Sequence, residues 1–116
     1  MPEAMLVLLA QIDALLAESS APDGPQTVLR IERTLTDGYA SALALEGERL
    51  RLDREIAGVT AAIDGGDSAR GAARLSHLAR RRSAVDGELA HLRGRLDQLR
   101  RRARELRMPP PQMQAP

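Results

Sequence analysis

The sequence predicts an all-α protein: a long antiparallel two-helix coiled-coil hairpin with a short N-terminal amphipathic helix. Apolar residues recur in alternating steps of three and four through two segments, 28–63 and 75–106. Such heptad spacing gives a helix one apolar seam that must be buried against another helix. The glycine-containing stretch DGGDS, residues 64–68, separates the two segments. Tyr39 is the only aromatic residue of 116, which favours a long bundle of aliphatic side chains over a compact globular core.

The predicted organisation has four parts. Residues 1–18 form an amphipathic helix, with Leu8, Ile12, Leu15 and Leu16 on one side and Gln11, Asp13 and Glu18 on the other. Residues 19–26, SSAPDGPQ, have the composition of a linker, and Thr27 is the expected N-cap of the next helix. The coiled-coil hairpin covers 27–107, with its turn at 64–68, and the third helix starts near Ala69. The proline-rich tail, 108–116, is predicted to be disordered.

The register of the hairpin follows from residue numbers. Facing residues of an antiparallel pair have numbers with a constant sum, and the two apolar series match when that sum is 134. Gly38 then faces Leu96, and Ile56 faces Leu78. The centre of this register is residue 67, inside the predicted turn. Asp37-Gly38 is a common turn dipeptide, but the heptad continues through it unshifted, which predicts an uninterrupted helix.

Composition excludes several classes of protein. The chain has no cysteine, so disulfides and thiolate metal sites are absent. The apolar run 5–10 follows no basic residue and is much shorter than the roughly 20 residues of a membrane span. We therefore expect a cytoplasmic protein. Residues 1–26 carry four acids and no base, whereas 70–116 carry twelve Arg and four acids, so the chain is expected partly to neutralise itself.

Two arginines interrupt the apolar seams. Arg49 and Arg82 occupy heptad core positions in nearby layers of the predicted register. The carboxylates that flank them are Glu46, Glu48, Asp53, Glu55, Asp86 and Glu88. We expect the arginines to reach out of the seam to these carboxylates. A structural ion-pair network that fixes register is the preferred interpretation; the alternative is a notch for a small ligand or partner, formed by Arg49, Arg82, Glu46, Glu48, Asp86 and Glu88.

The third helix is rich in arginine. Glu55–Arg81 and Glu32–Arg100 are the expected cross-helix pairs. A candidate basic surface, without evident acidic partners on the second helix, comprises Arg95, Arg101, Arg102, Arg104 and Arg107. Such a surface is typical of nucleic-acid binding. No aromatic residues interleave it to stack on bases, however, so a solvated face partly covered by the acidic N-terminal helix is the preferred interpretation.

A second set of apolar residues lies outside the seam of the second helix. It comprises Leu29, Tyr39, Leu43 and Leu50, here called the apolar stripe. The N-terminal helix is expected to cover it, and the alternative is a docking site for a second subunit or another protein. The small seam residues Gly38, Ala42 and Ala103 bury little area, which favours a homodimer.

The sequence offers no recognisable reaction chemistry. His77 and His91 lie fourteen residues apart, which is about 21 Å on a helix and too far for a shared metal ion. No phosphate-binding glycine loop and no nucleophile with a paired base is present. We therefore expect no catalytic residues, no cofactor, no metal and no small-molecule substrate, and we expect that the protein is not an enzyme.

One resemblance adds to this picture. The stretches LTDGYASALALEGERLRLDREI, residues 35–56, and LDQLRRRARELR, residues 96–107, resemble a group of short actinobacterial proteins predicted to be helical hairpins. In architecture the chain is similar to actinobacterial anti-sigma factors that bind cyclic-di-GMP, but it lacks their pattern E-x3-S-x2-R-x3-Q-x3-D. The sequence favours a non-enzymatic protein–protein interaction module that binds a protein partner, itself included. The resemblance implies the alternative, a regulator that binds a sigma factor or RNA polymerase.

Overall fold

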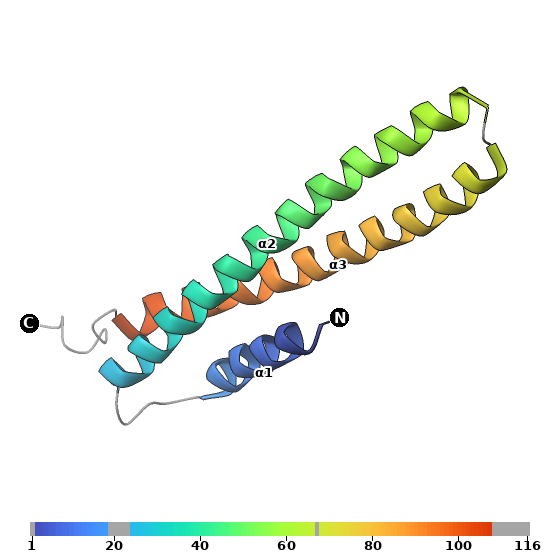
Figure 1. Ribbon diagram of the computed structural model, residues 1–116. Coiled ribbons are helices and arrows are strands. Elements are labelled where there is room, and N and C mark those ends of the chain that lie inside the picture. The colour runs from blue at the N-terminus through green and yellow to red at the C-terminus, as the bar shows by residue number, and fades with distance from the viewer. Residues whose placement is uncertain (1, 19–23, 67, 108–116) are drawn as a thin grey trace, which may run out of the picture. The chain divides into compact units, whose positions relative to one another are not determined.

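The structure, a computed structural model, describes residues 2–18, 24–66 and 68–107. Over these residues it consists of three helices: α1 (Glu3–Ala17), α2 (Gly24–Asp64) and α3 (Ser68–Arg107). α2 and α3 run side by side in opposite directions, and α2 leads into a turn at 65–66 (Figure 1). The predicted all-α hairpin with a short N-terminal helix is therefore confirmed.

The chain divides into two compact units. The first contains residues 1–41 and 92–116, and the second contains residues 42–91. Each has its own section of the heptad seam. The buried seam residues of the first unit are Ile31, Leu92, Leu96, Leu99 and Ala103, and those of the second are Ala42, Leu45, Leu52, Leu78, Val85 and Leu89.

Two glycines confirm the predicted register, one in each unit. In the first unit, a Cβ on Gly38 would collide with the side chain of Leu96. In the second unit, a Cβ on Gly71 would lie 2.5 Å from Cγ1 of Ile63. The residue numbers of both pairs add to 134, as the heptads predict. α2 also passes through Asp37-Gly38 without a break, because the missing side chain of Gly38 makes room for Leu96.

The helix boundaries differ slightly from the predicted ones. α2 begins at Gly24, so Thr27 is a buried residue of its first turn and the predicted N-cap is wrong. Pro25 explains the earlier start, because its fixed φ suits the first turn, where a missing N–H costs no hydrogen bond. Gly66 has a φ of +120°, which glycine adopts without strain. The rest of the predicted linker, 19–23, and the predicted tail, 108–116, lie outside the described residues.

α1 packs in cis within the first unit (Figure 1). It buries Met5, Leu8, Leu9, Ile12 and Leu15, while Leu16 is half-buried. Asp13 pairs with Arg95 of α3 at 3.0 Å, and Glu18 pairs with Arg30 of α2 at 3.1 Å. Arg102 of α3 also donates to the backbone carbonyl of Glu18 at 2.8 Å. These contacts join α1 to both long helices. No helix among the described residues is long and apolar enough to cross a membrane.

Candidate interaction surface

The two seam arginines of the second unit reach carboxylates on both helices. Arg82 of α3 donates from Nε to Oδ1 of Asp53 on α2 at 2.5 Å, and its Nη1 donates to Oδ2 of Asp86 one turn away. Arg49 of α2 donates to Oδ1 of Asp86 at 3.3 Å. Asp53, Arg82, Asp86 and Arg49 therefore form one chain of ion pairs that crosses the hairpin twice. This is the arrangement expected of arginines that leave an apolar seam.

Within this chain of ion pairs, Asp53 and Arg82 shift each other's pKa in opposite directions. The hydrogen bond from Arg82 lowers the pKa of Asp53 below its ordinary value of 3.8, and the positive charges of Arg82 and Arg49 lower it further. The hydrogen bond to Asp53 and the nearby negative charges raise the pKa of Arg82. Both arginine side chains remain more than a third exposed, at 38% for Arg49 and 35% for Arg82. The chain of ion pairs is therefore a solvent-facing link between the helices.

The predicted partners of two glutamates are wrong. Glu55 pairs with Arg74 at 3.1 Å instead of Arg81, and Arg81 binds Glu48 through Nε at 2.9 Å and Nη2 at 2.5 Å. In the first unit, Glu32 pairs with Arg107 instead of Arg100, which binds Asp97 on its own helix at 3.0 Å. An arginine side chain spans more than one helical turn, so heptad register fixes its backbone position without fixing its partner.

Glu88 stands apart from the other carboxylates of the predicted notch. Its residue is 8% exposed, and its Oε2 has no hydrogen-bond partner in the described structure. Glu48 is taken by Arg81, and Glu46 is half-buried. The notch residues are therefore divided among three environments: the chain of ion pairs that Arg49 and Arg82 share with Asp86, the separate Glu48–Arg81 pair, and the buried Glu88.

The candidate basic surface is largely neutralised within the first unit. Arg95 pairs with Asp13 of α1, and Arg107 pairs with Glu32 of α2. Arg102 pairs with Glu105 at 3.4 Å besides binding the carbonyl of Glu18. Arg101 donates to the carbonyl of Asp97 at 3.5 Å, and Arg104 makes no ion pair with a described residue. The expectation that these arginines lack acidic partners on the second helix is wrong for Arg107.

The apolar stripe is exposed, so the expected cover by α1 is not found. In the first unit Leu29 is 53% exposed and Tyr39 46%; in the second unit Leu43 is 69% exposed and Leu50 52%. α1 instead carries exposed apolar residues of its own, Leu6 and Val7. The ion pairs of Asp13 with Arg95 of α3 and of Glu18 with Arg30 of α2 hold α1 on another side of α2. A helix of fifteen residues cannot cover both faces of α2.

In the second unit, Leu43 and Leu50 belong to a longer pattern. Residues at alternating steps of four and three define an outer face: Leu43, Gly47, Leu50, Arg54, Ala57 and Ala61. All are exposed except Gly47, which is intermediate, and a Cβ on Gly47 would meet no atom within 4 Å. The step pattern is that of a second heptad seam on α2, nearly opposite the buried one. Sequence reasoning found only its leucines, because alanine and glycine between them carry little hydropathy signal.

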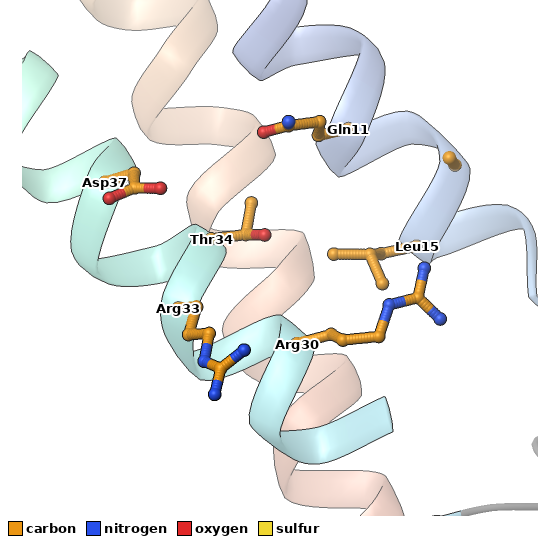
Figure 2. A pocket seen from close by; sticks show the side chains of 7 residues that line it. Gln11, Leu15, Arg30, Arg33, Thr34 and Asp37 are labelled. Carbon is orange, nitrogen blue, oxygen red and sulfur yellow. The ribbon is translucent and has the colours of Figure 1, made fainter. Parts of the chain in front are cut away.

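Three grooves lie among the described residues of the first unit, and the smallest, of about 220 Å³, is lined by Gln26, Leu29, Arg30 and Arg33. The other two are larger. One has a volume of about 320 Å³ between α1 and α2, and Figure 2 shows the side chains that line it: Gln11, Leu15, Arg30, Arg33, Thr34 and Asp37. Arg30 is already paired with Glu18, and the lining mixes both signs of charge. The other groove, of about 460 Å³, is mostly apolar and is lined by Pro25, Val28, Leu29, Leu106 and Arg107. Leu29 of the apolar stripe thus borders a hollow.

The described residues contain no group of three or more His, Cys, Asp or Glu side chains placed to hold a metal ion. Comparison of the chain with protein-family models, curated proteins and solved structures finds no match. The role of a regulator that binds a sigma factor or RNA polymerase therefore stays a prediction that rests on resemblance. The surfaces themselves carry the functional argument.

Proposed function

We propose that this chain is a non-enzymatic interaction module that presents the outer face of α2 to a helix of a protein partner. One observation carries the proposal: Leu43 and Leu50, two turns apart on α2, remain 69% and 52% exposed although the chain has a buried seam that accommodates leucines. Fully burying a leucine side chain contributes about 1.5–3 kcal/mol, so an exposed pair at heptad spacing favours association.

The spacing also supports a helical partner. Leu43 and Leu50 recur after seven residues, and Gly47 is the outer-face residue between them. A partner helix that runs along such a face meets one apolar residue on every second turn. Between these residues it can approach the backbone of α2 closely. A flat or globular partner surface would gain nothing from this periodicity.

The proposal is tested with two matched double variants. Leu43→Glu with Leu50→Glu places charge on the outer face, and Leu6→Glu with Val7→Glu changes comparably exposed residues on α1. Self-association is measured by sedimentation equilibrium, and binding to host proteins by capture followed by reconstitution with the purified partner. We expect only the α2 variant to lose association, while both keep helical circular dichroism. Association that survives unchanged in the α2 variant contradicts the proposal.

A further inference from the structure

The three grooves of the first unit adjoin one another along the start of α2. Arg30 and Arg33 line both the groove of about 320 Å³ and the groove of about 220 Å³. Leu29 lines the groove of about 220 Å³ and also the apolar groove of about 460 Å³. Because neighbouring grooves share these side chains, one extended ligand can lie across all three. The three grooves together are here called the trough.

The trough is apolar at one end and positively charged in its middle. The apolar end is lined by Pro25, Val28, Leu29 and Leu106, and Leu29 is 53% exposed. The middle, the groove of about 220 Å³, holds two arginines, and none of the described residues that line it is acidic. Small-molecule sites usually have this composition, with mostly apolar walls and a few polar groups that fix the orientation of the ligand.

Arg33 is the cation that the trough leaves available for a ligand. Arg30 binds Glu18 through Nη1 at 3.1 Å, and Arg107, at the apolar end, pairs with Glu32. Arg33, in contrast, makes no ion pair with a described residue. A guanidinium presents five N–H donors in a planar fork, which suits a carboxylate held by two parallel hydrogen bonds. The trough therefore has an open position for an anionic group.

The direction of Arg33 places this anionic group near the apolar end. Side chains of a helix lean toward its N-terminus, so Arg33 extends over the preceding turn, which carries Leu29. Figure 2 shows its guanidinium pointing away from Asp37, an acid at the opposite end of the trough. An anion bound to Arg33 is therefore next to aliphatic side chains and away from the carboxylate that would repel it.

We propose that the trough binds an amphiphilic anion, a fatty carboxylate, with its head group on Arg33 and its hydrocarbon chain across Leu29 into the apolar groove. Aliphatic walls suit a flexible hydrocarbon chain. A nucleobase or another planar ring would need an aromatic side chain to stack on, and Tyr39, the only aromatic residue of the protein, does not line the trough. The site belongs to the first unit and does not depend on the proposed function, whose outer face lies in the second.

Isothermal titration calorimetry of the whole protein with dodecanoate, below its critical micelle concentration, tests the site. We expect saturable binding. Arg33→Gln removes the cation and Leu29→Asn removes apolar surface, and each should raise the dissociation constant roughly tenfold. Two matched controls should leave it within about twofold. Arg51→Gln changes another exposed α2 arginine that makes no ion pair with a described residue, and Leu6→Asn changes a leucine of 54% exposure on α1.

Three further probes separate the contributions of head group, hydrocarbon chain and membrane. Dodecyltrimethylammonium has the same hydrocarbon chain with a positive head group, and acetate has the carboxylate without the chain. We expect neither to bind measurably, because the site needs both parts of the ligand. Vesicles of phosphatidylglycerol present anionic head groups on a membrane surface, and we expect them to retain no protein in sedimentation.

Each contrary result overturns the inference. Equal binding of the cationic and anionic amphiphiles would show that the protein binds hydrocarbon without using Arg33. Losses in Arg51→Gln or Leu6→Asn as large as those in the site variants would show diffuse attraction, and retention on vesicles that dodecanoate does not displace would make a membrane surface the occupant. A protein that binds no dodecanoate has no such site. Leu43→Glu with Leu50→Glu should bind dodecanoate as the wild type does, so loss of a protein partner in that variant bears on the proposed function alone.

Discussion

Gly38 of α2 faces Leu96 of α3 so closely that the chain has no room for a Cβ at residue 38. Leu96 is 1% exposed and cannot move away into solvent. The contact explains why an Asp-Gly dipeptide, which elsewhere favours a turn, lies within a continuous helix. The glycine lowers helix propensity, and the buried leucine opposite it provides the compensating packing.

This contact leads to a prediction with opposite signs at two glycines. Gly38→Ala should destabilise the chain by about 1–3 kcal/mol, because overpacking outweighs the gain in helix propensity. Gly94→Ala, also in the first unit, should stabilise it by about 0.5–1 kcal/mol, since a Cβ there meets nothing within 4 Å. Urea unfolding of both variants checks the pair. Stabilisation by Gly38→Ala would show that Leu96 is not seated as described.

The acid limb of the stability curve should depend on the Asp53–Arg82 pair. The pKa of Asp53 in the folded chain lies below its ordinary value of 3.8, so the unfolded chain takes up this proton first as the pH falls. The stabilising contribution is complete above pH 3.8 and is lost as the pH falls through the folded pKa. Asp53→Asn and Arg82→Gln should each flatten the dependence of melting temperature on pH below about 4.

The same experiment includes an internal check. Once Arg82 is replaced by Gln, adding Asp53→Asn should produce little further flattening, because the hydrogen bond that lowers the pKa is already gone. A second, equally large effect of Asp53→Asn would show that Arg82 is not the main cause of the shift.

The buried carboxylate of Glu88 should be dispensable for folding. Its residue is 8% exposed and Oε2 has no hydrogen-bond partner among the described residues, so the folded chain bears a desolvation cost there. Replacing Glu88 with Met, which has a similar length, should raise the free energy of unfolding by about 1–3 kcal/mol. Asp97→Asn on the exposed side of α3 is the comparison. A marked loss of stability in Glu88→Met would mean that this carboxylate has a partner essential to the fold.

Nucleic-acid binding through α3 should be weak. Arg95, Arg102 and Arg107 are each held by an acid of the same unit, and the net charge of the whole chain is only +1. Few phosphate contacts remain available to release counterions. In gel-shift titrations with duplex DNA and single-stranded RNA, we expect only weak retardation between 50 and 200 mM salt, on the order of nonspecific attraction. Tight binding that falls steeply with salt would restore the nucleic-acid hypothesis.

The sequence predicted backbone register well and side-chain partners poorly. Gly38–Leu96 and Ile63–Gly71 follow from heptad arithmetic, because only one alignment of two apolar seams buries both. Arg81, in contrast, has carboxylates within reach on either side, and rotamer choice sends it to Glu48. The apolar stripe was found, but its exposure was not predicted, since sequence alone does not say which side of α2 the short helix α1 covers.

The outer face of α2 could be predicted from the sequence only in part. Gly47, Ala57 and Ala61 continue the heptad of Leu43 and Leu50, so the signal was present in the spacing. Small residues in a helix are equally typical of a solvent-exposed side, and sequence alone does not show that Leu43 and Leu50 beside them are exposed as well.

The last prediction concerns the seam arginines themselves. If Arg49 and Arg82 serve only to fix register, replacing both with Leu should preserve the hairpin and leave the melting temperature equal or higher, because apolar residues often replace such networks without loss. The gain should be small, since Asp53 and Asp86 would then lose the cations that hold them. The reverse change, Asp53→Asn with Asp86→Asn, should lower the melting temperature by leaving two arginines unpaired at core positions. Circular dichroism melts of the two double variants separate the roles: a large drop for the Leu variant would identify the chain of ion pairs as a major source of stability. If the Leu variant instead melts at an unchanged temperature but cross-links in more than one hairpin register, the role of the ion pairs is to select one alignment of the two helices from several of similar energy.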